Sequence, residues 1–398
     1  MANIAIIGTL DSKGHEHGFV ADLIRERGHQ VVLIDVGTGS DPTLVPDVTR
    51  FDVAASIGLD LQALLDRRDR GECVVAMSKA APVLVEQLAA EGRIDGIISL
   101  GGGGGTALGT AAMRALPIGF PKLMVSTLAS GNTAHYVGTK DIVMFPSIVD
   151  VAGLNRISRL VFTRAAGAIC GMVEAEINED EARPLIVASM FGNTTDLVNQ
   201  AKEILEEAGY EVLVFHATGT GGKTMESLIE SGMVAGVLDV TTTEWADELL
   251  GATLSAGPER MDAMTKASVP AVVAPGCLDM ANYGERDSVP SELEGRNFYI
   301  HNPQVTLMRT SAEECAQLGK IIAEKANANT APVAIMLPTQ AISVISAEGQ
   351  PFHDPEADAA LFGAIRDNAK VEVTELDTEI NSPDFAEACA RKLLELLE

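Results

Sequence analysis

Short apolar runs alternate with longer amphipathic stretches along the chain, which predicts strands that alternate with helices. The apolar runs are rich in β-branched residues, as in 4–8 and 31–35, and a stretch of helical length lies between these two runs. This pattern is typical of parallel strands whose two faces are covered by helices. The sequence therefore predicts an α/β fold built on doubly wound parallel sheets.

The same pattern occurs twice, which predicts an internal duplication. The unit over 4–35 has a counterpart over 185–216, with Gly28 and Gly209 in register. The runs 95–99 and 121–126 correspond in the same way to 235–239 and 270–275. We therefore expect two Rossmann-like domains: an N-terminal nucleotide-binding domain over 1–180 and a C-terminal domain over 181–398 with a second polar pocket. Ligands should bind at the loops beyond the carboxyl ends of the strands.

Five successive glycines, Gly101 to Gly105, join an apolar run to a helix-compatible segment. Glycine has no Cβ, so its backbone can approach an anion closely, and the first N–H groups of the helix would point at that anion. A flexible connector without a ligand is the alternative. We expect a phosphate of the nucleotide to lie against Gly102, Gly103, Gly104, Gly105 and Thr106.

The loop after the first strand should reach the same edge of the sheet. It offers Gly8, Thr9, Asp11 and Lys13 as nucleotide contacts. The spacing Gly-x-Gly-x-x-Gly is absent, and neither loop ends in Gly-Lys-Ser/Thr, so this is neither a dinucleotide fingerprint nor a Walker-type P-loop. Asp35, at the end of the second strand, would either accept a ribose hydroxyl or stabilise the turn before Gly37.

A polar loop after the run 121–126 adds further candidates. Lys140 is a candidate phosphate partner and Asp141 a candidate ligand of Mg²⁺, although a solvated loop pair explains both residues almost as well. The remaining expected nucleotide contacts of this loop are Ser130, Gly131, Asn132 and Thr133.

The second half carries four candidate catalytic residues: His216, Asp239, Glu244 and His301. His216 precedes the glycine-rich segment 218–222, which we expect to form an anion-binding nest, and a histidine at a strand end can transfer protons. Glu244 also fits the first turn of a helix after a hydroxyl N-cap, whereas Asp239 would be costly to bury unpaired. Either the two histidines, two aspartates and Arg260 converge in a second polar pocket, or each belongs to a local turn or cap.

Composition narrows the class of protein. The 398 residues carry a formal net charge of −27, without a run of Lys or Arg, which disfavours nucleic-acid binding. Five scattered cysteines without a Cys-x-x-Cys pair predict reduced thiols and no structural zinc. We find no basic leader and expect no membrane-spanning stretch, so we predict a cytoplasmic protein that does not bind membranes.

The ordered motifs of the chain resemble those of the UPF0261 family of Tm-1-like proteins, which includes the tobamovirus-inhibiting N-terminal domain of a tomato resistance protein. They are Gly8 to Lys13, the five glycines, 216–222, 241–244, 301–303 and 351–358. The resemblance implies two Rossmann-like domains, a homodimer and ATP binding by the first domain through Gly8, Thr9, Gly102 to Thr106 and the loop around Ser130. It leaves the reaction undefined. One departure is that 341–343 and 345–346 stand where the family has Gly-x-Ser followed by Asp.

We therefore expect an ATP-binding, cytosolic enzyme that acts on a small metabolite with Mg²⁺ and ATP, by phosphoryl transfer or hydrolysis. One alternative is a nucleotide-dependent binding or regulatory protein without turnover. Another is a nucleotide-independent isomerase or lyase that uses His216 and His301.

Overall fold

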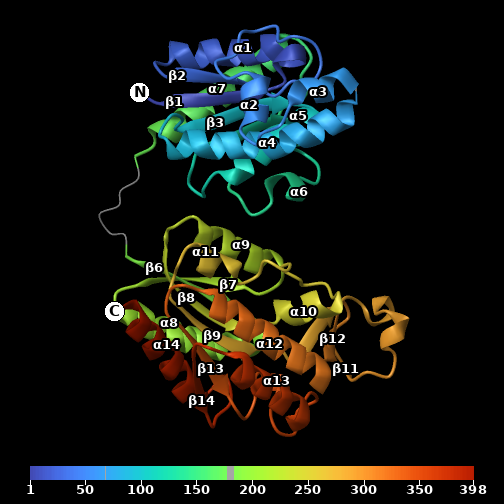
Figure 1. The fold of residues 1–398 in the computed structure, drawn as a ribbon, viewed down its shortest axis with the longest axis vertical. Helices are drawn as coiled ribbons and strands as arrows, with labels where there is room; N and C mark the ends of the chain where they lie inside the picture. The colour runs from blue at the N-terminus through green and yellow to red at the C-terminus, as the bar shows by residue number, and fades with distance from the viewer. Residues whose placement is uncertain (68, 177–182) are drawn as a thin grey trace. The chain divides into compact units, whose positions relative to one another are not determined.

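The chain folds into two compact units, Met1–Asn178 and Glu179–Glu398, each built on its own parallel sheet (Figure 1). The computed structural model describes residues 1–67, 69–176 and 183–398. The predicted domain boundary between residues 180 and 181 lies outside these described residues. The prediction of an α/β fold with two parallel sheets is confirmed.

The sheet of the N-terminal unit has five parallel strands in the order β2-β1-β3-β4-β5. Ile6 and Ile98 of the central strands are fully buried because helices cover both faces. The strand order reverses between β1 and β3, which is where such sheets bind ligands. The strands are β1 (Asn3–Gly8), β2 (Gln30–Asp35), β3 (Gly96–Gly101), β4 (Lys122–Ser126) and β5 (Val143–Pro146).

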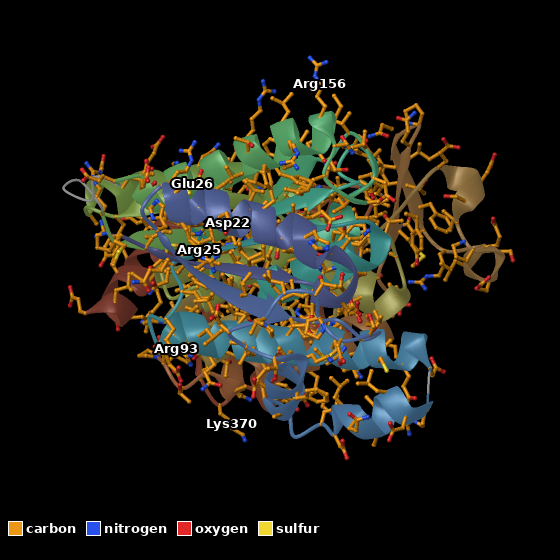
Figure 2. The ribbon with its side chains drawn as sticks, turned by 90° about the horizontal axis from the view of Figure 1, so that it is seen from above. Asp22, Arg25, Glu26, Arg93, Arg156 and Lys370 are labelled. Atoms are coloured by element: carbon orange, nitrogen blue, oxygen red, sulfur yellow. The ribbon has the colours of Figure 1, made fainter. Side chains whose placement is uncertain are left out.

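Two layers of helices enclose this sheet. One core cluster packs α1 and α7 against one face, and another packs α2 to α5 against the other. Charged side chains of α1, such as Asp22 and Arg25, and Arg156 at the start of α7 point outward (Figure 2). The helices are α1 (Leu10–Glu26), α2 (Arg50–Ala55), α3 (Leu61–Arg67), α4 (Arg70–Ala90), α5 (Gly103–Ala115), α6 (Ala134–Val137) and α7 (Arg156–Glu174).

Helix α4 corrects one expectation from the sequence. Its segment Gly71–Ala90 is long and apolar enough, by length and composition alone, to cross a membrane. In the fold, however, Met77, Ala81 and Val85 of this helix are fully buried in the core cluster on one face of the sheet. The apolar composition of α4 is therefore accounted for in part by its packing within the unit.

The sheet of the C-terminal unit has six parallel strands in the order β14-β13-β9-β8-β6-β7. Its first five strands along the chain follow the same spatial order as the sheet of the N-terminal unit, as expected of a duplication. Gly28 and Gly209 both adopt positive φ, +89° and +97°, in the turn before the second strand of each unit. The strands are β6 (Leu185–Met190), β7 (Glu211–His216), β8 (Val234–Thr241), β9 (Ala271–Gly276), β13 (Val333–Pro338) and β14 (Glu372–Leu376).

Helices cover both faces of this sheet as well. A core cluster joins α8 and α14 to one face, while α9 and α12 contact the strands on the other. The helices are α8 (Thr195–Glu207), α9 (Thr220–Glu230), α10 (Glu244–Leu250), α11 (Asp262–Lys266), α12 (Ala312–Ala328), α13 (Pro355–Asn368) and α14 (Pro383–Leu397), with 3₁₀ turns η1 (Gly192–Thr194), η2 (Arg286–Ser288), η3 (Ser291–Leu293) and η4 (Val344–Ser346).

A small antiparallel sheet, which the sequence patterns did not predict, is inserted after β9. Its strand order is β10-β12-β11, formed by β10 (Met280–Tyr283), β11 (Phe298–Asn302) and β12 (Val305–Arg309). The turn between β11 and β12 is stabilised by a hydrogen bond from the Gln304 N–H to Asn302 Oδ1, 2.9 Å long. The motif of residues 301–303 therefore forms a hairpin turn.

Candidate functional site

A cleft of about 780 Å³ opens at the carboxyl edge of the N-terminal sheet, where the strand order reverses. This volume lies within the usual range for small-molecule sites. The wall on the β1 and β3 side is polar, whereas α3, α4 and α5 contribute apolar side chains. The lining residues are Thr9, Asp11, Ser12, Lys13, Thr38, Gly39, Ser40, Leu65, Asp69, Cys73, Val74, Gly101, Gly102, Gly103, Gly104, Gly105, Leu108 and Asp150.

The glycine run forms the junction between β3 and α5. Gly102 is the N-cap, and Gly103 to Gly105 form the first turn of this 13-residue helix. The Thr106 N–H bonds to the Gly102 carbonyl at 2.8 Å, but the N–H groups of Gly103, Gly104 and Gly105 have no hydrogen-bond partner among the described residues. Three free donors at the positive end of a helix dipole thus line the cleft.

Steric crowding explains only part of the glycine run. A Cβ atom on Gly101 would lie 2.7 Å from the Cα atom of Gly105, so this position requires glycine. Gly103 and Gly104, in contrast, have no atom within 4 Å of such a Cβ. Packing against the rest of the unit therefore does not require glycine at these two positions.

The segment after β1 lines the same cleft as the glycine run, with Thr9 directly after the strand and Asp11 and Lys13 at the start of α1. Asp11 Oδ2 accepts a hydrogen bond from the Gly39 N–H at 2.8 Å, whereas Asp11 Oδ1 is buried without a partner among the described residues. Among the lining residues that the structure describes, Lys13 is the one cationic residue. An unsatisfied carboxylate oxygen and a lysine in the lining of one cleft are groups of the kind that bind a cation and a phosphate, respectively.

Gly8 and Asp35 lie next to the cleft but do not line it. A Cβ atom on Gly8 would lie 2.0 Å from Nε2 of His17, so Gly8 makes room for this buried ring. Asp35 is 1% exposed, and its Oδ1 accepts hydrogen bonds from the N–H groups of Leu10 at 3.1 Å and Gly37 at 2.8 Å. Burial raises the pKa of this carboxyl. Asp35 thus holds two loops together, as the turn-stabilising alternative expects.

A second cleft of about 610 Å³ adjoins the first at Asp150, which lines both. Its other lining residues follow β4 and β5 and include Ser130. Gly131, Asn132 and Thr133 belong to the same loop as Ser130 but line neither cleft. Thr106 is fully buried, with Oγ1 2.7 Å from the Ser126 Oγ, so its side chain supports the floor below the glycine run.

Lys140 and Asp141 lie elsewhere, which corrects their expected place beside the glycine run. Asp141 Oδ1 is 2.6 Å from Nζ of the buried Lys122, and its Oδ2 accepts a hydrogen bond from the Gly119 N–H at 2.8 Å. Lys122 is the first residue of β4, so this ion pair lies at the amino edge of the sheet. The loop after β4 returns to that edge before β5 begins, and it carries Lys140 there.

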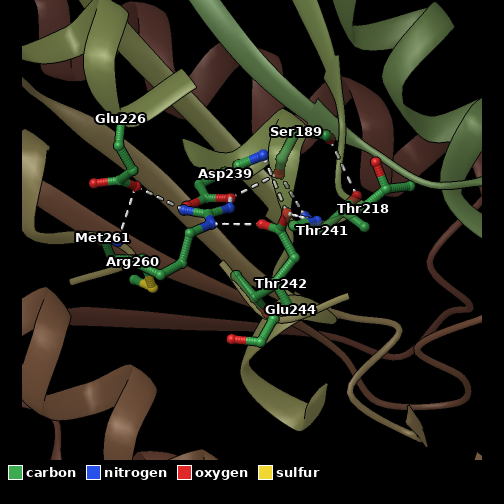
Figure 3. Close-up of polar contacts among 12 residues, drawn as sticks. Ser189, Thr218, Glu226, Asp239, Thr241, Thr242, Glu244, Arg260 and Met261 are labelled. Carbon is green, nitrogen blue, oxygen red and sulfur yellow. Dashed lines mark hydrogen bonds and ion pairs between the residues drawn. The ribbon is translucent and has the colours of Figure 1, made fainter. Parts of the chain in front are cut away.

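In the C-terminal unit, Asp239 and Glu244 both bond to the buried Arg260 (Figure 3). Of the groups expected to converge on Arg260, Asp239 does so. Arg260 Nη2 donates to Asp239 Oδ1 at 2.7 Å, and Arg260 Nε donates to Glu244 Oε2 at 2.8 Å. Glu226 completes the cluster with an oxygen 3.0 Å from Arg260 Nη1, and the Ser189 hydroxyl donates to Asp239. We call these five residues the Arg260 cluster. In this cluster, the three carboxylates of Glu226, Asp239 and Glu244 share the single guanidinium of Arg260.

The nest expected over residues 218–222 is filled by the chain itself. Glu244 Oε1 accepts hydrogen bonds from the N–H groups of Gly219 at 2.6 Å and Gly222 at 3.0 Å. A Cβ atom on Gly222 would lie 2.0 Å from Glu244 Oε2. The glycines of this loop thus admit an internal carboxylate at the start of α9, so no open anion site is formed by these two N–H groups.

His216 and His301 occupy different sheets of the C-terminal unit. His216 ends β7 and stacks on Phe191 with ring centroids 5.4 Å apart. His301 is exposed on β11. No hydrogen bond or ring contact joins the two histidines in the part of the chain that the structure describes, and their catalytic roles stay predictions.

Comparison with known proteins places these two units in one family. The model of the uncharacterised protein family UPF0261 N-terminal domain matches residues 2–178, and that of the UPF0261 C-terminal domain matches 183–397. The chain belongs to the UPF0261 family. A UPF0261 protein of Clostridium tetani is 48% identical over 399 residues, which cover 99% of each chain.

A plant relative and a solved structure extend the comparison. The tomato ToMV resistance protein Tm-1(GCR237) is 37% identical over 98% of this UPF0261 chain, which spans 55% of the plant protein. MurG of Acinetobacter baumannii matches across 100% of this chain and 92% of its own length, at 13% identity and a TM-score of 0.22. The likeness to MurG is too low to bear on function.

Sequence patterns missed several cleft residues of this UPF0261 protein. Asp150 follows the end of β5 by four residues, but β5 spans only Val143–Pro146, too short a run to be recognised as a strand. Had β5 been recognised, a polar residue shortly after its end would have indicated Asp150 as a cleft residue. Leu65 and Val74 come from α3 and α4, and no local motif distinguishes them from other core-facing apolar residues.

Asp279, Arg309 and Asp358 form a second buried group of charged residues in this UPF0261 protein. From the burial of Asp279 we expect the stability of the fold to depend on pH. Burial raises the pKa of Asp279 from its usual 3.8 to about 6, although nearby Arg309 opposes this shift and Asp358 adds to it. Asp279 Oδ2 accepts a 2.8 Å hydrogen bond from the Ser343 hydroxyl, while Oδ1 has no partner among the described residues. Between pH 4 and 6 the folded state therefore binds more protons at Asp279 than the unfolded state does, so this group lowers the free energy of unfolding as pH rises.

Asp279→Asn should remove this contribution. As the pH rises from 4 to 7, the wild type loses the contribution of Asp279 and the variant does not. We therefore expect the free energy of unfolding of the variant, minus that of the wild type, to increase by about 2 kcal/mol over this range. Urea denaturation at several pH values measures the difference. Asp287→Asn, at an exposed position of η2, is the matched control. A constant difference between Asp279→Asn and the wild type over this range would contradict the prediction.

Proposed function

We propose that this UPF0261 protein binds ATP with Mg²⁺ in the cleft of its N-terminal unit and transfers or hydrolyses the γ-phosphoryl group. The observation that carries the proposal is the set of three unpartnered N–H groups of Gly103, Gly104 and Gly105, at the start of α5 and in the lining of a 780 Å³ cleft. Backbone donors at a helix N-terminus bind phosphate oxygens, and the helix dipole favours their negative charge.

The chemistry of the lining supports one orientation of the nucleotide. Leu65, Val74 and Leu108 offer an apolar surface suited to the base, on the side of the cleft formed by α3 to α5. Thr38 and Ser40, which follow β2, offer hydroxyls to the ribose. The phosphates would then lie on the glycine run, with the γ-phosphate toward Asp150.

Two charged side chains fit the phosphates and the metal ion. Lys13, in the lining of the same cleft, would neutralise phosphate charge. The buried, unpartnered Oδ1 of Asp11 fits one ligand position of Mg²⁺, which proteins bind through one or two carboxylates together with substrate phosphates. When bound, the ion would neutralise charge on the β- and γ-phosphates.

Titration calorimetry of the full chain with ATP and MgCl₂, with phosphate release followed in the same sample, tests the proposal. Saturable binding that weakens when EDTA removes Mg²⁺ is the expected result. Absence of ATP binding would rule out the proposal and would direct the search toward phosphorylated metabolites at the glycine run. Binding with slow release would favour a nucleotide-holding unit that awaits a second substrate.

A nucleotide-dependent binding protein without turnover is the second candidate. It is favoured by the relationship to a plant protein whose name describes resistance to a virus, because binding to a partner without turnover would be sufficient for such a role. Phosphate release that never exceeds that of a protein-free control, despite ATP binding, would favour this candidate over an enzyme.

A further inference from the structure

The second cleft of the N-terminal unit has the features of a substrate site next to the proposed phosphate site. It follows the ends of β4 and β5, at the same carboxyl edge of the sheet as the glycine run. Its volume of about 610 Å³ is sufficient for a small metabolite. Nothing in the ATP proposal requires this second cleft.

Two side chains stand at the boundary between the clefts. A Cβ atom on Gly102 would lie 3.9 Å from Asp150 Oδ1 and 3.7 Å from Thr127 Oγ1. A carboxylate so near an anion-binding loop would repel a phosphate unless it also interacts with a hydrogen-bond donor or a cation. The hydroxyl of a second substrate, placed between Asp150 and the γ-phosphate, would supply such a donor.

The remaining lining favours a neutral hydroxyl compound. The hydroxyls of Thr127 and Ser130 have no hydrogen-bond partner in the described part of the chain, whereas the Ser126 hydroxyl is engaged by Thr106. Pro146, Ile148 and Val149 provide an apolar wall. Among the described residues that line it there is no Lys, Arg or His, so these residues offer no cation to a carboxylated or phosphorylated substrate.

The apolar wall is built at a cost in backbone energy. Ile148 has a φ of +66°, a conformation that is rare for β-branched residues and costs about 1–3 kcal/mol. Two hydrogen bonds hold the turn: the Val149 N–H donates to the Ser147 carbonyl at 2.7 Å, and the Ser147 hydroxyl donates to the Val149 carbonyl at 2.6 Å. These bonds hold the backbone of Ile148 at the cleft, where its side chain is 76% exposed.

We propose that this second cleft binds a neutral alcohol or polyol as the phosphoryl acceptor, with Asp150 as the base between the two sites. This inference rests on the proposed ATP site. The acceptor oxygen would form a bond to the γ-phosphorus while the bond from that phosphorus to the β–γ bridging oxygen breaks. ADP leaves with the electron pair of that bond, and the hydroxyl proton passes to the Asp150 carboxylate.

The first experiment tests the binding site. Ligand-observed NMR would follow glycerol, 1,2-propanediol, 1,4-butanediol and myo-inositol with the full chain, Mg²⁺ and a non-hydrolysable ATP analogue. We expect saturation transfer to at least one of these compounds, and at least a fivefold weaker signal with Ser130→Trp, whose side chain would fill the cleft from an exposed position. Thr163→Trp, exposed on α7, is the control for an added tryptophan.

Calorimetry with ATP and Mg²⁺ separates this inference from the proposed function. Ser130 was expected from the sequence as a nucleotide contact, but it lines only the second cleft, so Ser130→Trp should bind ATP within about twofold of the wild type if the nucleotide occupies the first cleft. No polyol signal with the wild type, or an equal signal with Ser130→Trp, would overturn the inference. Loss of ATP binding in Ser130→Trp would show that the nucleotide itself occupies the second cleft. This result would overturn the inference of a polyol site but not the proposal that the N-terminal unit binds ATP. Failure of the wild type to bind ATP would instead remove the proposed function.

The second experiment tests Asp150. ³¹P NMR of the wild type with ATP, Mg²⁺ and the polyol that binds should show a phosphate monoester. Asp150→Asn should form this product about 100-fold more slowly while keeping the polyol signal, since a positioned base contributes about 10²–10⁴ in rate. An unchanged rate in Asp150→Asn, or no monoester from the wild type with polyol bound, would overturn the assignment of Asp150 as the base.

Discussion

Replacement of Gly104 by aspartate should abolish ATP binding while leaving the N-terminal unit at least as stable as the wild type. The new carboxylate would stand beside the free N–H groups at the start of α5 and would repel the phosphates from the cleft. The same charge in the first turn of a helix is favourable for the helix dipole, and no atom lies within 4 Å of a Cβ at this position. Affinity and stability should therefore change in opposite directions.

Calorimetry and thermal denaturation together measure both effects of Gly104→Asp. We expect at least a 100-fold loss of ATP affinity, about 3 kcal/mol, and a midpoint of thermal unfolding that does not fall. Gly104→Asn is the matched control because its side chain has nearly the same shape without the charge, so it should lose less affinity than Gly104→Asp. Equal affinities for the wild type and Gly104→Asp would show that ATP does not contact the glycine run.

Replacement of Arg260 by methionine should destabilise the C-terminal unit by about 3–5 kcal/mol. Arg260 is 1% exposed and pairs with three carboxylates. Methionine would fill much of the volume but would leave the carboxyl groups of Asp239 and Glu244 without their cation in the core, a far greater penalty than the loss of a surface pair. Glu244 would also lose its anchor and with it the geometry of the loop before α9.

Urea denaturation followed by tryptophan fluorescence measures the effect of Arg260→Met on the stability of the C-terminal unit. The chain has a single tryptophan, and this residue, Trp245, is 5% exposed in α10 directly after Glu244. Lys266→Met removes a pair with Glu230 whose side chains are 57% and 41% exposed, and it should cost at most about 1 kcal/mol. A loss below 1 kcal/mol in Arg260→Met would show that the Arg260 cluster does not stabilise the fold.

Much of the fold follows from the hydrophobic pattern because parallel strands impose a regular arrangement. Every strand ends at the same edge of its sheet, so the loops after β1 and β3 could be placed together without any knowledge of long-range contacts. Gly28 and Gly209 marked the same turn in both units because each adopts a positive φ that favours glycine. The glycine run could likewise be proposed as a binding loop from the sequence, because the backbone freedom of glycine depends only on the residue itself.

The partners of the charged residues could not be predicted in this way. Glu244 was expected as a catalytic residue beside an open nest, but its carboxylate fills that nest through contacts with Gly219 and Gly222, more than twenty residues earlier in the chain. Asp141 was expected beside the glycine run, but the long connection from β4 carries it to the opposite edge, where it pairs with Lys122. Asp150 was passed over because β5 is short.

The sequence by itself determined the alternation of strands and helices, the duplication, and the edge of the N-terminal sheet where a ligand should bind. Only the tertiary structure decided which carboxylates line a cleft, as Asp11, Asp69 and Asp150 do, and which are enclosed with a cation in the core, as Asp239 and Glu244 are. The physical reason is the range of the interactions. Backbone propensity and burial periodicity act over a few neighbouring residues, whereas the surroundings of a charge depend on segments that meet only when the chain has folded.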